Sequence, residues 1–173
     1  MLFRSKTLVQ QIDVLSSIAT AFSSFAEFPD QTNEFIDFAE EIQLCLEIFK
    51  DYDIKFIKPK EKIQGDFDKS NLVRIVTNLV KNSIQATSEL DDPKIEIELK
   101  KINNNLELKI RDNGTGIPSS LKEKIFEPNF TTKNKGTGLG LSIIKKLIDS
   151  YNGKISFTSK PGKTVFKITV PII

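Results

Sequence analysis

The pattern of apolar and polar positions divides the chain into a long helical segment and a mixed α/β segment. Residues 2–27 contain neither glycine nor proline, and their apolar side chains recur at alternating steps of four and three. This seam consists of Leu8, Ile12, Leu15, Ala19, Phe22 and Ala26. It is typical of a helix in a coiled coil or four-helix bundle; a helix docked on its own domain is the alternative. We expect residues 1–28 to form a bundle helix, residues 29–33 a linker, and residues 34–173 a separate domain.

The segment after the linker alternates between strand and helix patterns. Strands are predicted at 34–38, 53–59, 61–66, 94–101, 106–112, 153–159 and 164–171, and helices at 39–50, 68–89, 118–126 and 139–151. Asp68 is the expected N-cap of the second of these helices. The pattern predicts an α/β fold, a two-layer sandwich in which three helices cover one face of a mixed sheet of about five strands. The N-terminal helix would protrude from it.

Composition narrows the class of protein. The chain has 173 residues, of which 39% are hydrophobic and 28% are charged, as in a soluble globular protein. Its net charge of +2 is too small to indicate nucleic acid as a partner. A single cysteine, Cys45, fits a reducing compartment, and no apolar run approaches the roughly 20 residues that span a bilayer. We therefore expect a cytoplasmic location. The absence of histidine excludes His-based triads and imidazole bases.

Two asparagines interrupt the apolar face of the helix predicted at 68–89. Asn78 and Asn82 are one turn apart in the stretch RIVTNLVKNSIQAT. Asparagine is a mediocre helix former, so its repetition on one face of a core helix indicates a function. The alternative is that both side chains cap a neighbouring loop.

Two glycine-bearing turns carry candidate chemistry. In GTGLGL, Gly136, Gly138 and Gly140 lead into a helix without a capping side chain, and such a helix start can bind phosphate. The glycine spacing and the lysine-rich segment before it do not fit a dinucleotide fingerprint. In RDNGTGIP, the carboxylate of Asp112 ends a strand and could accept a hydrogen bond from an exocyclic amine. Taken alone, this second stretch is more often a simple turn.

A third glycine stretch, PGKT at 161–164, does not fit a Walker A motif. That motif needs a glycine five residues before Gly162, where the chain has Phe157, and it precedes a helix, whereas this turn lies between two strands.

The order of four stretches resembles the ATP-binding catalytic domain of sensor histidine kinases, within the GHKL (Bergerat-fold) superfamily. The matching stretches are NLVKNSIQAT, DNGTGI, IFEPNFTTK and GTGLGL. Four motifs in the family order make this a specific signal, which covers roughly residues 34–171. The residues of these four motifs are most similar to those of the nitrogen-regulation type of sensor kinase.

The resemblance implies roles for the residues of the nucleotide site. Asn82 would bind the Mg²⁺ that bridges the phosphates of ATP, and Asn78 would orient phosphate or metal-bound water. Asp112 would bind the adenine amino group, with Thr164 assisting it through water. The residues expected to line the rest of the base and phosphate sites are Gly114, Gly116, Thr132, Lys133, Gly136, Gly138, Leu139 and Gly140. Residues 117–138 would form a lid anchored by Phe126 and Phe130.

The sequence departs from the family pattern at two positions. Position 129 is Asn where many relatives have a second aromatic residue, which could loosen the packing of the lid. Position 85 is Gln where many kinases carry a basic residue.

The resemblance also implies what the whole protein does. The ATPases of the superfamily carry a glutamate at the position of Asn78, and an amide cannot accept a proton from water. We therefore expect transfer of the γ-phosphoryl group to a histidine outside this chain, with residues 1–28 as the second helix of a dimerisation bundle. The expected partners are the phosphoacceptor-histidine helix, a response regulator receiver domain and a second copy of the chain. The full-length protein could be anchored in the inner membrane. A GHKL-type ATPase and a degenerate nucleotide-binding scaffold are the alternatives.

Overall fold

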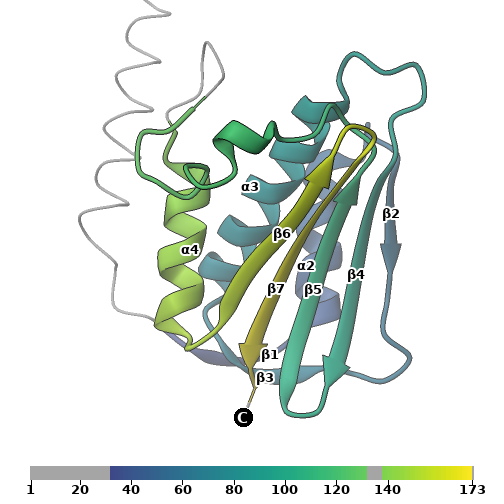
Figure 1. Cartoon of the computed structure of the whole chain (residues 1–173). Helices are drawn as coiled ribbons and strands as arrows, with labels where there is room; N and C mark the ends of the chain where they lie inside the picture. Colours follow the sequence, from purple (N-terminus) through teal and green to yellow (C-terminus); the bar gives the residue numbers. More distant parts are fainter. Residues whose placement is uncertain (1–31, 132–137, 173) are drawn as a thin grey trace, which may run out of the picture.

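The computed structural model describes residues 32–131 and 138–172 (Figure 1). The predicted bundle helix, most of the linker, and the candidate site residues Thr132, Lys133 and Gly136 lie outside these ranges. The strands are β1 (Glu34–Asp37), β2 (Ile54–Ile57), β3 (Gln64–Phe67), β4 (Ile95–Ile102), β5 (Asn105–Asp112), β6 (Lys154–Lys160) and β7 (Lys163–Pro171). The helices are α2 (Phe38–Leu46), α3 (Lys69–Thr87) and α4 (Gly140–Ser150), with short 3₁₀ turns η1 (Glu47–Phe49) and η2 (Ser119–Leu121).

Five of the described strands form a mixed sheet in the order β2-β4-β5-β7-β6. β2 pairs with β4 in parallel, and the other pairs are antiparallel. Helices α2, α3 and α4 lie together on one face of this sheet (Figure 1). The strands alternate accordingly: β5 buries Leu106, Leu108 and Ile110 in the core beneath the helices. The predicted two-layer sandwich is confirmed.

Two of the predicted strands form a separate small sheet. β1 and β3 pair antiparallel with each other and do not join the five-stranded sheet. Asp37 ends β1 and caps α2, because its carboxylate accepts hydrogen bonds from the backbone N–H groups of Ala39 and Glu40. The small sheet therefore fixes where α2 begins.

The prediction of a helix at residues 118–126 is wrong. Only η2 forms a helical turn there, and successive turns follow it, with the N–H of Lys124 donating to Leu121 and that of Glu127 to Lys124. Ile125 is the one fully buried side chain of this described segment. The segment thus lacks the apolar stripe through which tertiary packing stabilises an α-helix.

Tyr151, the C-cap residue of α4, joins three parts of the fold. Its ring stacks on Phe67 of β3 with centroids 3.9 Å apart. Its hydroxyl accepts hydrogen bonds from the backbone N–H of Asp68 and the side chain of Asn71, at the start of α3. The same hydroxyl donates to Oδ1 of Asn33. Asp68 is the N-cap of α3, as predicted, and receives the N–H of Asn71 on its carboxylate.

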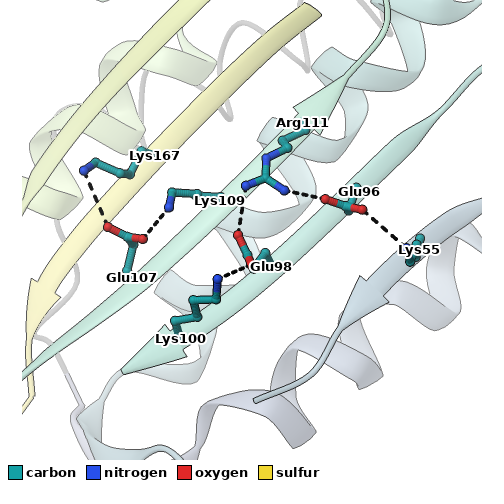
Figure 2. Close-up of polar contacts among 8 residues, drawn as sticks. All are labelled: Lys55, Glu96, Glu98, Lys100, Glu107, Lys109, Arg111 and Lys167. Atoms are coloured by element: carbon teal, nitrogen blue, oxygen red, sulfur yellow. Dashed lines mark hydrogen bonds and ion pairs between the residues drawn. The ribbon is translucent and has the colours of Figure 1, made fainter. Parts of the chain in front are cut away.

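The face of the sheet away from the helices carries a lattice of ion pairs (Figure 2). The lattice runs across β2, β4, β5 and β7 through Lys55, Glu96, Glu98, Lys100, Glu107, Lys109, Arg111 and Lys167. The hydrogen bond from Lys100, together with the charge of Arg111, holds the pKa of Glu98 below its ordinary value.

None of the helices within residues 32–131 and 138–172 has the length and apolar character of a membrane span.

Candidate functional site

Helix α3 presents Asn78 beside the start of α4, and Asn82 follows one turn later on the same helix. Its apolar stripe, which includes Leu72, Ile75 and Leu79, is buried, and the half-buried Asn78 and Asn82 lie beside that stripe. The Asn78 side chain donates from Nδ2 to the backbone carbonyl of Arg74, 2.8 Å away. A Cβ added at Gly140 would lie 2.8 Å from Oδ1 of Asn78. Asn78 of the asparagine stretch and Gly140 of GTGLGL, more than sixty positions apart in the sequence, are therefore in contact.

Asp112 ends β5 with its carboxylate turned toward α3. The side chain is 6% exposed. Its Oδ2 accepts a hydrogen bond from the hydroxyl of Ser83 at 3.1 Å, and its Oδ1 accepts the backbone N–H of Gly114 at 3.0 Å. Burial raises the pKa of Asp112, while these two hydrogen bonds act in the opposite direction.

The turn after Asp112 fits between α3 and the β6–β7 hairpin because of its glycines. A Cβ at Gly114 would lie 2.5 Å from the backbone oxygen of Ala86, on α3. A Cβ at Gly116 would lie 2.7 Å from the backbone of Lys160, and its φ of +78° also favours glycine. Backbone hydrogen bonds join the turn to both neighbours: Thr115 donates to Ala86, and Gly162 donates to Gly114.

Thr164 lies beside Asp112 on the helix-facing side of the sheet. The two residues are register partners in β7 and β5, and Thr164 is 3% exposed. Its hydroxyl is 2.9 Å from that of Ser159, which also accepts the backbone N–H of Ile117 at 2.8 Å. A row of polar side chains thus runs from α3 across the end of the sheet to the first residue of the predicted lid.

Helix α4 begins without a side-chain cap, as the sequence predicts. Leu139 occupies the N-cap position and makes no side-chain capping hydrogen bond. Gly138 has a φ of +68°, and a Cβ there would lie 2.5 Å from the backbone of Asn129. Phe126 packs edge-on against Phe157, with ring centroids 5.9 Å apart. The described parts of the predicted lid are therefore anchored on the core, as expected for Phe126 and Phe130.

Five of the predicted site residues fall into two groups that the structure assembles. One group joins Asn78 to Gly140, and the other joins Asp112 to Gly114 and Thr164. The structure also shows two contributors that sequence reasoning missed, Ser83 and Ser159. Their contacts depend on strand register and on which face of α3 turns inward, and no local motif signals them. The ligand roles expected of all these residues stay predictions.

The residues present fit a magnesium–nucleotide complex. The buried carboxylate of Asp112 acts only as a hydrogen-bond acceptor. It can therefore bind a ligand group that donates a hydrogen bond, such as an amino group. Arg74 is one turn before Asn78, and its buried Nη1 has no hydrogen-bond partner among the described residues. A bound anion, such as a phosphate group, would supply the missing acceptor. No described cluster of three or more His, Cys, Asp or Glu could hold a metal alone. A magnesium ion held by phosphates and one amide oxygen would need no such cluster.

Comparison with known proteins identifies the class. Residues 67–173 match the family of histidine kinase-, DNA gyrase B- and HSP90-like ATPases, and the chain belongs to this family. It is 36% identical over 143 residues to the sensory histidine kinase/phosphatase NtrB of Vibrio alginolyticus, a match that covers 77% of this chain and 39% of that protein. The likeness to nitrogen-regulation sensor kinases that the four sequence stretches indicated is confirmed.

Solved structures of histidine kinases are also similar to this chain. The catalytic domain of histidine kinase ThkA matches with a TM-score of 0.73 and 33% identity, over 81% of this chain and 95% of that one. ThkA in complex with response regulator protein TrrA matches with a TM-score of 0.80 and 27% identity, over 96% of this chain and 50% of that one. The chain therefore contains the ATP-binding catalytic domain of a two-component histidine kinase. It spans between 18% and 39% of the length of eight curated relatives.

Proposed function

We propose that the chain is the C-terminal catalytic part of a two-component sensor histidine kinase. It binds Mg-ATP and transfers the γ-phosphoryl group to a histidine on another polypeptide segment. The observation that carries the proposal is the buried Asp112 carboxylate, held by Ser83 and Gly114 at the end of β5. The sequence contains no histidine, so the acceptor cannot belong to this chain.

Each part of the site has one task in this reaction. Asp112 accepts the adenine amino group, and Thr164 supports it through water. The amide oxygen of Asn82 binds Mg²⁺, and the N–H groups at the start of α4, near Leu139, bind phosphate. Bound ATP supplies the phosphoryl group, and its magnesium ion neutralises the charge that develops during in-line transfer. The domain contributes positioning and electrostatics, because the group that activates the acceptor histidine lies outside it.

Asn78 supports the kinase over a true ATPase. Its Nδ2 is engaged by the carbonyl of Arg74, so its oxygen is the group that faces the start of α4. A carboxamide oxygen cannot accept a proton from water at neutral pH, so hydrolysis should be slow. A true ATPase would release phosphate steadily, and this release would vanish in Asn78→Ala.

Calorimetry with ATP, with and without Mg²⁺, tests nucleotide binding. Wild type should bind ATP more tightly with Mg²⁺, and Asn82→Ala should lose that difference because it loses the magnesium ligand. Asn104→Ala, in the exposed turn between β4 and β5, is the matched control and should behave like wild type. A degenerate scaffold would show no metal-dependent binding in any variant.

Phosphoryl transfer is tested by adding the missing acceptor. The chain is mixed with a bundle fragment that carries the phosphoacceptor histidine, and phosphohistidine is assayed with radiolabelled ATP. Label should appear on the fragment and be absent with Asn82→Ala. Acid-labile phosphate on the purified chain alone would contradict the proposal.

The proposal extends to partners and location. Residues 1–28 would be the second helix of the dimerisation bundle, joined by residues 29–33 to the catalytic domain at 34–173, and two copies would pair through this helix. The catalytic domain would act in the cytoplasm as part of a protein that could be anchored in the inner membrane. A response regulator receiver domain would take the phosphoryl group from the histidine. The complex of ThkA with response regulator TrrA supports this part.

A further inference from the structure

We propose that Ser83 is a positioning residue for the base-binding carboxylate of Asp112. Its hydroxyl keeps that carboxylate as a pure acceptor, so that a base with an amino group is preferred over one with a carbonyl at the same place. This inference rests on the proposed function, because it presumes that Asp112 binds a nucleotide base.

The geometry assigns one internal donor to each carboxylate oxygen. Ser83 follows Asn82 on α3 and is 1% exposed, so its hydroxyl has no access to bulk water. It donates to Oδ2 of Asp112, while the backbone N–H of Gly114 donates to Oδ1. A carboxylate oxygen can accept two hydrogen bonds, so each oxygen keeps room for a donor from a ligand. The two internal bonds also fix the plane of the carboxylate.

Among the described residues, no charged side chain pairs with Asp112 in place of the hydroxyl. Across the sheet, Asp112 is flanked by Ile95 of β4 and Thr164 of β7, neither of which titrates near neutral pH. The charged residues that line a hollow of 580 Å³ together with Asp112 are Asp53, Lys55, Lys94, Glu96 and Arg111. Within the described residues, none of these forms an ion pair with Asp112. The hydroxyl of Ser83 and the N–H of Gly114 therefore carry the stabilisation of its negative charge.

The protonation state of Asp112 decides which base it can bind. Burial raises the pKa of this carboxyl, and the bond from Ser83 opposes that rise. Without the hydroxyl, the carboxyl would protonate at a higher pH. A protonated carboxyl can donate a hydrogen bond to a carbonyl oxygen, whereas the ionised form can only accept one from an amino group. Ser83 thus maintains the preference for the amino group of adenine over a carbonyl at the same ring position.

The test measures ATP and inosine 5′-triphosphate binding by calorimetry, on the full chain with Mg²⁺, between about pH 5 and pH 8. Ser83→Ala should weaken ATP binding about tenfold and inosine 5′-triphosphate binding less, because a hydrogen bond to a charged group is lost. The acid limb of ATP binding should also move to higher pH. Thr87→Val is the matched control, since the hydroxyl of Thr87 is equally buried on α3 but donates only to the carbonyls of Ser83 and Ile84. It should keep the wild-type selectivity and pH profile.

The outcomes separate this proposal from the proposed function. If wild type binds ATP and Ser83→Ala keeps both its selectivity and its pH profile, the role of Ser83 is overturned and the kinase assignment stands. Equal losses for both nucleotides, or the same changes in Thr87→Val, would indicate a structural role and also overturn it. If wild type binds no ATP, both proposals fall. Should Ser83→Ala unfold by circular dichroism, Ser83→Cys keeps the size with a weaker donor, and the same upward pH shift is required.

Discussion

Gly116 and Gly162 share one backbone conformation but differ in their surroundings. Both have a φ of +78°, in the left-handed region. A Cβ at Gly116 would meet the backbone of Lys160 at 2.7 Å, whereas a Cβ at Gly162 would meet nothing within 4 Å. The pair therefore separates the cost of the conformation from the cost of the missing space.

Alanine substitution at the two positions should give unequal losses of stability. Gly162→Ala should lower the free energy of unfolding by about 1–2 kcal/mol, the cost of a left-handed conformation. Gly116→Ala should lower it by more than about 3 kcal/mol, because the turn must also move away from the hairpin. Urea denaturation of both variants measures the difference. Equal losses would mean that the 114–117 turn is not tightly held against β6 and β7.

Asp112→Asn should stabilise the domain while abolishing ATP binding. Burial raises the pKa of Asp112, so the folded state holds a proton on this carboxyl at pH values where the unfolded chain has lost it. Its contribution to stability therefore falls as the pH rises through the folded-state pKa. The neutral amide removes that loss, so the variant should be more stable than wild type at neutral pH, with the advantage shrinking in acid. Thermal unfolding without nucleotide at several pH values checks this; an Asn variant less stable than wild type at neutral pH would contradict it.

At the scale of single residues, the sequence identifies those residues that belong to a local motif. Asp112 ends a strand and precedes two glycines, so its position was predictable. Ser83 and Ser159 were not, because their contacts arise from the depth of α3 against β5 and from the register of β6 with β7. The close approach of Gly114 to Ala86 depends on the same tertiary placement and leaves no trace in the local pattern.

At the scale of elements, the hydroxyl of Tyr151 links α4 to the start of α3 and to Asn33, which precedes β1. Tyr151→Phe keeps the ring stacked on Phe67 but leaves the N–H of Asp68 without its acceptor. The free energy of unfolding should fall by about 1–2 kcal/mol, and the amide of Asp68 should exchange with solvent faster. Hydrogen exchange and urea denaturation measure both effects.

Tyr52→Phe is the matched control for that variant, because Tyr52 is half exposed and makes no hydrogen bond through its hydroxyl within the described residues. Its stability and exchange pattern should equal those of wild type. The same loss in both variants would show that the junction at Tyr151 does not stabilise the fold.

Elements with a long, regular pattern were predictable, and the short strands were also located, but the pairing of the short strands was not predicted. The alternation in β4 and β5 and the apolar stripe of α3 identify these elements without tertiary information. The pairing of β1 with β3 was not predicted, because strands of four residues have too little pattern to choose a partner. The segment 118–126 has helix-forming residues but buries too little apolar surface to become an α-helix.

At the scale of the whole molecule, the catalytic domain should be independent of the N-terminal segment. A continuous core from Ile36 to Ile172 lies within the described residues. Deleting residues 1–31 should therefore leave the thermal unfolding temperature and the ATP affinity unchanged. If residues 1–28 form the proposed dimerisation helix, analytical ultracentrifugation should find a dimer for the full chain and a monomer for residues 32–173. A truncated chain that fails to fold, or that stays dimeric, would contradict this division.

No described helix covers the charged face of the five-stranded sheet (Figure 1), and this affects how the domain meets its surroundings. Opposite charges alternate over this face (Figure 2), so their fields cancel within a short distance and the face stays well hydrated without a covering helix. A surface on which both signs of charge are interspersed discourages association between the exposed sheet faces of two copies. Because the pKa values of Glu98 and Glu107 are lowered, these two carboxylates keep their charge to lower pH than ordinary glutamates, and the face becomes cationic, and attractive to polyanions, only once they are protonated.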